Sequence, residues 1–117
     1  MKYLLLMYDD ESNWVDATPE DMAAEMKAYG EFDQAVEQNG AFLAGEGLQG
    51  VETATTVRVR NDERLVTDGP FAETKEQLGG FYLLECKDLD EAIEWAAKIP
   101  GAQQGMIEVR PVMNYDA

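Results

Sequence analysis

Two observations predict an α+β fold for this chain of 117 residues. Short apolar or alternating segments typical of strands recur along the chain, and two longer segments carry apolar residues at the spacing of an amphipathic helix. Their order is strand, helix, strand, hairpin, strand, helix, strand, which is two βαβ units joined by a hairpin. The sequence therefore predicts one ferredoxin-like domain over residues 1–117, with an antiparallel sheet and both helices on one face.

The first half of the chain supplies the first βαβ unit. Residues 2–8 form an apolar run that predicts a buried strand. Thr18 and Pro19 are typical of an N-cap and a first helical position, and Gly40 is typical of a helix end. Residues 41–48 predict the second strand. The inward stripe of the helix is expected to consist of apolar residues three or four apart: Met22, Met26, Tyr29, Phe32 and Val36.

The middle of the chain predicts a hairpin. Residues 55–60 alternate strictly, as a strand requires, and residues 65–67 predict its short return arm. The turn at Asp68 follows, and a short helix over residues 72–77 is expected after it.

The second half of the chain supplies the second βαβ unit. Residues 81–86 and 106–113 predict strands. Between them, a helix is expected to start at Asp88 and to stop at Pro100. Its inward stripe is expected to be Leu89, Ala92, Ile93, Ala96 and Ile99.

The charge excludes several classes of partner. With 24 acidic and 9 basic side chains and no histidine, the formal charge is −15. A negative field repels nucleic-acid phosphates and anionic lipids, so we expect neither nucleic acid nor a membrane as a partner. The N-terminal segment has no signal-peptide cleavage site, which predicts a cytoplasmic protein. The single cysteine, Cys86, is interpreted as a small buried hydrophobe.

Both faces of the predicted sheet are apolar. One alternating set of positions holds Leu4, Leu6, Tyr82 and Leu84, and the other holds Tyr3, Leu5, Met7, Phe81 and Leu83. Because the helices cover only one face, we expect two copies to pack sheet to sheet as a homodimer. This packing would create a pocket at the junction, with four polar side chains enclosed near it: Glu46, Arg58, Glu108 and Arg110.

Residues 66–85 read VTDGPFAETKEQLGGFYLLE. This block resembles the DGPF-motif branch of the YCII-related family of small bacterial proteins, and the similarity extends from KYLLLMY to VRPV. The resemblance implies a ferredoxin-like subunit that forms a dimeric α+β barrel. It also implies that the gene lies beside one for an extracytoplasmic-function sigma factor, as is common in this branch. Relatives in the wider family are thought to use a histidine and an aspartate as an acid-base pair; the aspartate corresponds to Asp68, but this chain has no histidine.

Asp68 is the candidate catalytic residue, and two interpretations of it stay open. The carboxylate before Gly-Pro is explained by turn chemistry, in which it accepts backbone N–H bonds. Alternatively it acts as a general base in a partly apolar pocket. In that case Arg58 or Arg110 would bind a substrate carboxylate or a developing enolate, and Tyr82 would donate a proton. Glu46 and Glu108 complete the expected substrate-binding set.

The leading functional hypothesis is a dimeric barrel that binds a small organic molecule, with acid-base chemistry of the lyase or isomerase type. The alternative is a non-catalytic accessory protein that acts with a sigma factor. No cofactor or metal is expected, because Asp9-Asp10-Glu11 lacks the spaced acids of a calcium loop and the glycines at 45, 47 and 50 precede no phosphate-loop lysine. Trp14 is interpreted either as a lid over the pocket or as a contact with the partner subunit.

Overall fold

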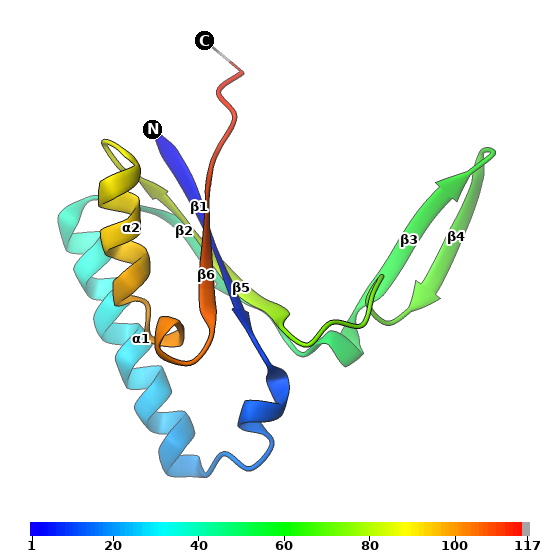
Figure 1. The fold of residues 1–117 in the computed structure, drawn as a ribbon, viewed down its shortest axis with the longest axis horizontal. Coiled ribbons are helices and arrows are strands. Elements are labelled where there is room, and N and C mark those ends of the chain that lie inside the picture. The colour runs from blue at the N-terminus through cyan, green and yellow to red at the C-terminus, as the bar shows by residue number, and fades with distance from the viewer. Residues whose placement is uncertain (116–117) are drawn as a thin grey trace.

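The computed structural model describes residues 1–115 and has the predicted α+β architecture. Four antiparallel strands form a sheet in the order β2-β5-β1-β6. Helices α1 (Pro19–Asn39) and α2 (Leu89–Lys98) pack against one face of this sheet (Figure 1). The ferredoxin-like prediction is therefore confirmed. The strands are β1 (Lys2–Asp9), β2 (Phe42–Gly47), β5 (Gln77–Glu85) and β6 (Met106–Pro111).

A hairpin between β2 and β5 stands apart from this sheet. Strands β3 (Thr55–Arg60) and β4 (Glu63–Asp68) pair only with each other, and the hairpin projects from the body (Figure 1). We call residues 55–68 the arm. Its turn residues Asn61 and Asp62 have φ of 51° and 66°, and positive φ at both central residues is typical of two-residue hairpin turns. The arm raises the radius of gyration to 16.4 Å, against about 13 Å for a compact chain of this length.

Several elements differ from the sequence-based expectation. Residues 72–77 do not form the expected helix; bends occupy 71–72 and 75–76, and β5 begins at Gln77 rather than Phe81. The return strand of the arm runs to Asp68 instead of stopping before it. The structure also adds three short 3-10 helices that the sequence did not predict, η1 (Glu11–Trp14), η2 (Val51–Thr53) and η3 (Pro100–Gln103).

The ends of α1 confirm the sequence-based prediction. Thr18 and Asp21 form a capping box: the Asp21 backbone N–H donates to Thr18 Oγ1 at 3.1 Å, and the Thr18 N–H donates to Asp21 Oδ2 at 3.0 Å. Pro19 takes the first helical position, and Gly40 ends the helix with a φ of 81°. These caps fix where α1 starts and stops along the sheet.

The inward stripe of α1 differs from the prediction at Met26, and Met22, although it lies on the cavity side, is 50% exposed. Phe32 and Val36 are buried as expected, whereas Met26 is 75% exposed. Counting back from Val36 in steps of four and three leads through Phe32 and Tyr29 to Glu25, not to Met26. A carboxylate therefore lies on the side of α1 that faces the sheet.

The stripe of α2 is also shifted. Leu89 and Ile93 were expected to point inward, but they are 48% and 49% exposed. The buried positions follow the spacing i, i+3, i+4, i+7, and they are Ala92, Trp95, Ala96 and Ile99. The bulky Trp95 thus replaces Ile93 in the core, where its ring packs edge-on against Phe32 at 6.1 Å.

The pairing of β1 with β5 decides which apolar side chains share a face. Tyr3 lies opposite Leu84 and Leu5 lies opposite Tyr82, and all four are buried under the helices. The sequence analysis grouped Tyr82 and Leu84 with Leu4 and Leu6, and this grouping was wrong. Alternation within a strand does not fix the register between strands. The opposite side, which we call the open face, carries partly exposed apolar side chains: Leu4, Leu6, Phe81 and Leu83.

Cys86 is 2% exposed, which confirms its interpretation as a buried hydrophobe. Burial, followed by the negative charge of Glu91, raises the pKa of its thiol to about 11 from 9.0. The thiolate fraction at neutral pH is then lower by about 100-fold than in the unfolded chain. We expect DTNB at pH 8 to label the native protein at least about 100-fold more slowly than the urea-unfolded protein. Equal rates would show that the thiol is accessible in the native state.

Neither helix within residues 1–115 has the length and apolar character that a membrane crossing requires.

Candidate functional site

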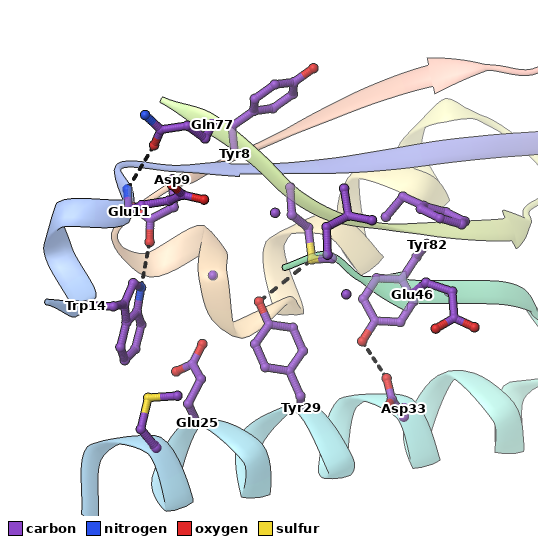
Figure 2. Close-up of a pocket in the computed structure, with 18 of the residues that line it drawn as sticks. Tyr8, Asp9, Glu11, Trp14, Glu25, Tyr29, Asp33, Glu46, Gln77 and Tyr82 are labelled. Carbon is purple, nitrogen blue, oxygen red and sulfur yellow. Dashed lines mark hydrogen bonds between the residues drawn. The ribbon is translucent and has the colours of Figure 1, made fainter. Parts of the chain in front are cut away.

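A cavity of about 530 Å³ lies between α1 and the helix-covered face of the sheet (Figure 2). This volume is within the range of small-molecule sites, about 300 to 1,000 Å³. The residues around it come from α1, β2, β5, the end of β1 and the 3-10 helices η1 and η3. Six lining residues are aromatic: Tyr8, Trp14, Tyr29, Phe42, Phe81 and Tyr82. The pairing of the strands places the Phe81 side chain on the open face, and the Tyr8 ring points away from α1 (Figure 2), so Trp14, Tyr29, Phe42 and Tyr82 supply the aromatic side chains on the helix side.

Glycines in the sheet explain why the cavity exists. Gly45 lies opposite Tyr82, and Gly47 lies opposite Gly80, so three positions on the helix-covered face carry no side chain. An added Cβ at Gly45 would lie 2.8 Å from the Tyr82 ring, and one at Gly80 would lie 2.7 Å from Met7 Cε. A Cβ at Gly47, which lines the cavity, would meet no atom within 4 Å. Missing side chains over two neighbouring strands thus leave a space that α1 does not fill.

Tyr82 and Asp33 join the sheet to α1 at one end of the cavity. The Tyr82 hydroxyl donates a hydrogen bond of 2.5 Å to Asp33 Oδ1 (Figure 2). The Tyr82 ring is 6% exposed and packs edge-on against Phe32 at 5.0 Å. Burial first, and then the hydrogen bond to Asp33, raise the pKa of Tyr82 well above its ordinary value. The phenol therefore stays protonated near neutral pH and its proton is held by Asp33.

Removing this hydroxyl tests the contact. We expect Tyr82→Phe to lower the free energy of unfolding by about 2 kcal/mol, because the bond is made to a charged acceptor. Tyr3→Phe is the matched control, since Tyr3 is a second buried tyrosine on the same face, and its hydroxyl donates to the weak acceptor Met1 Sδ at 3.7 Å. Urea unfolding measures both. Equal losses in the two variants would contradict a specific role for the bond to Asp33.

Asp9 fixes the tryptophan at the other end of the cavity. Its Oδ2 accepts hydrogen bonds from Trp14 Nε1 and Gln104 Nε2, each at 3.1 Å. Its Oδ1 accepts from the Asp10 N–H at 2.8 Å and from Asn13 Nδ2 at 2.9 Å. The carboxylate at Asp9 is therefore a structural acceptor, and it holds the Trp14 indole at the cavity wall (Figure 2).

Glu11 connects η1 to β5 and η2 through two hydrogen bonds. Its backbone N–H donates to Gln77 Oε1 at 2.9 Å, and its Oε1 accepts from the Val51 N–H at 3.0 Å. These bonds connect β5 and η2, which flank the base of the arm, to the residues that close the cavity.

The structure brings together only some of the residues that the sequence singled out. Tyr82 and Glu46 line the cavity, although Glu46 is mostly exposed. Arg58 and Asp68 lie on the arm, where the register places them on opposite faces. Both are exposed.

Glu108 and Arg110 lie on the open face of β6, where a contact of 3.9 Å joins them. Within one chain, these two residues and the two arm residues do not meet the cavity. Their assignment to a site stays a prediction that requires a second copy.

Sequence reasoning missed Asp33, Glu25 and the function of the glycines. Two signals could have found them. The 3-4 spacing of α1 extends through Glu25, and glycines inside strand-like segments indicate a place where a ligand approaches the backbone. Within residues 1–115, no group of three or more metal-binding side chains is placed to hold a metal ion.

The fold and the cavity define a ferredoxin-like α+β protein with a hollow beside its first helix. The chain belongs to the YCII-related domain family, whose model matches residues 1–116. It is 38% identical over 117 residues to an uncharacterised protein of Rhizobium meliloti (strain 1021), and the match covers 98% of this chain and 94% of that protein.

One solved structure of similar fold is 5-chloro-2-hydroxyhydroquinone dehydrochlorinase from Burkholderia phenoliruptrix AC1100, in complex with 2,5-dihydroxybenzoquinone. The TM-score is 0.52 and the identity 14%, over 97% of this chain and 94% of that chain. At this identity the likeness establishes the fold.

Proposed function

We propose that this protein binds a small organic molecule in the cavity between α1 and the sheet. The observation that carries the proposal is the hollow itself: about 530 Å³, with aromatic side chains from α1, η1, β2 and β5 at its walls, Tyr29, Trp14, Phe42 and Tyr82. The hollow opens to solvent along exposed lining residues such as Glu46, Gly47 and Leu48, so a small molecule can enter it. The dehydrochlorinase of similar fold in complex with a small cyclic molecule supports a site of this kind.

A fragment screen by thermal shift tests the proposal. A ligand present at ten times its dissociation constant should raise Tm by about 5 °C, since it binds the folded state alone. Hits should compete with one another, because they share one cavity. A library of small aromatic compounds without any competing set of hits would contradict the proposal.

We further propose that the working form is a cytoplasmic homodimer of one-domain chains, from the DGPF branch of the family. The open face supports the dimer, because its partly exposed apolar side chains span neighbouring strands of the sheet. The arm adds exposed apolar groups, with Val57 57% and Val66 58% exposed on one face. An arm of this kind has no core of its own and gains stability by packing against another surface.

Acid-base chemistry of the lyase or isomerase type remains a proposal for Asp68. Its support is the exposed position of Asp68 at the base of an arm that extends away from its own body (Figure 1). In a dimer, such an arm is free to reach a second copy. Asp68→Asn tests this role: a ligand that binds and reacts unchanged in the variant removes Asp68 from the mechanism.

The alternative function is an accessory role with a sigma factor. The formal charge of −15 supports it, because a strongly acidic surface attracts a basic partner. Co-purification with the sigma factor should then weaken as salt rises from about 0.05 to 0.5 M, since ions screen exposed charges. A complex that is indifferent to salt would contradict an electrostatic origin.

A further inference from the structure

The cavity carries acidic groups without compensating cations. Five carboxylates line it, and within residues 1–115 no lysine or arginine does. The carboxylates are Asp9, Glu11, Glu25, Asp33 and Glu46. A concave wall of one charge sign with low-dielectric surroundings concentrates counter-ions of the opposite sign. The cavity is therefore unsuited to an anionic ligand.

Three of these carboxylates have protein partners. Asp9 accepts from Trp14 and Gln104, Glu11 accepts from the Val51 backbone, and Asp33 accepts from Tyr82. Their oxygens are already used to hold the structure together.

Glu25 differs from these three. It is half-buried on the inward side of α1, and among the described residues no donor lies within hydrogen-bond distance of its carboxylate. Figure 2 shows it between Trp14 and Tyr29, with the carboxylate directed toward the sheet. Burial, and then the negative charge of Asp9, raise the pKa of Glu25. The ionised Glu25 carboxylate thus has no compensating charge beside it among residues 1–115, and a bound cation would supply that charge.

The aromatic walls suit the same kind of ligand. Trp14 and Tyr29 flank Glu25, and the Tyr82 ring lies further along the cavity (Figure 2). The faces of tryptophan and tyrosine rings attract organic cations through their quadrupoles. The sulfur atoms of Met7 and Met22 add apolar surface for an uncharged body.

We propose that the ligand of this cavity is an organic ammonium ion with an apolar or aromatic body, and that Glu25 is the partner of its ammonium group. The ammonium donates to the Glu25 carboxylate while the body lies among the rings. This inference rests on the proposed function and adds the charge of the ligand to it.

Three probes of matched shape test the charge. They are 2-phenylethylamine, 2-phenylethanol and phenylacetate, and calorimetry measures their binding to the wild-type chain. We expect the amine to bind at least about tenfold more tightly than the alcohol, because it gains a charge-assisted hydrogen bond. The anion should bind most weakly of the three.

Two variants test the residue. Glu25→Gln should weaken binding of the amine about fivefold or more and leave the alcohol nearly unchanged. Glu37→Gln is the matched control, because it removes the same charge from an exposed position of α1 that is not among the residues lining the cavity. It should change amine binding by less than about twofold, as expected for a screened distant charge.

The outcomes separate this inference from the proposed function. Equal affinities for amine and alcohol, or equal losses in Glu25→Gln and Glu37→Gln, overturn the ammonium proposal. So does a wild-type chain that binds none of the three probes while thermal-shift hits occupy the cavity. In each of these cases the proposed small-molecule function is retained if thermal-shift hits still compete for one site. If no compound binds in the cavity, both the proposed function and the ammonium inference are wrong.

Discussion

Gly47→Phe is expected to abolish ligand binding while the fold is retained. Gly47 lies on β2 at the wall of the cavity, opposite Gly80 on the helix-covered face. An added Cβ there meets no atom within 4 Å, so a larger side chain enters the hollow rather than the core. A phenyl ring occupies part of the space beside β2, where it blocks the hollow to a ligand, and we expect affinity for any thermal-shift hit to fall by at least about 100-fold.

Gly47→Ala is the matched control for this variant. It removes the same glycine but adds only a methyl group, so the hollow remains and binding should stay within about threefold of the wild type. Circular dichroism and urea unfolding report whether each variant is folded. A folded Gly47→Phe chain that still binds the hits would place their site elsewhere on the protein.

Leu6→Glu is expected to convert a homodimer into a monomer. Leu6 lies on the open face, opposite Phe81 on β5 and Glu108 on β6. A carboxylate there is desolvated when two sheets pack together, and it also faces the charge of Glu108. We expect the dimer dissociation constant to rise by at least about 100-fold, and light scattering at micromolar concentration should report the 13.0 kDa chain.

Ile93→Glu is the control for the added charge. Ile93 is 49% exposed on α2, on the other side of the molecule from the open face, so its variant should remain dimeric. A wild-type protein that is monomeric at micromolar concentration would contradict the dimer. A dimeric Leu6→Glu variant would show that the open face is not the interface.

Local signals in the sequence were sufficient for the order of the elements. Thr18, Pro19 and Gly40 fix the ends of α1 through backbone hydrogen bonds that depend on neighbouring residues alone. The arm was predicted as a hairpin for the same reason, since its alternation and turn are local. Its separation from the main sheet was not predictable, because which strands pair depends on contacts between distant residues.

The site was less accessible to sequence reasoning than the fold. Tyr82, which the sequence singled out, lines the cavity, but its partner Asp33 lies 49 positions away in the chain. Nothing in the acidic turn after β1 indicated that the Asp9 carboxylate accepts from four donors, including Gln104, which is 95 positions away. Side-chain partners of this kind follow from the tertiary arrangement, so the sequence alone does not reveal them.

Methionine methyl NMR tests the central claim, which is that the cavity beside α1 is the binding site. The chain has six methionines, and Met7 and Met22 line the cavity. Met26 and Met113 are 75% and 71% exposed and lie outside it. Titration with a thermal-shift hit is predicted to move the methyl signals of Met7 and Met22 and to leave those of Met26 and Met113 in place. A bound ligand that moves only the latter pair, or none of the four, would contradict the account.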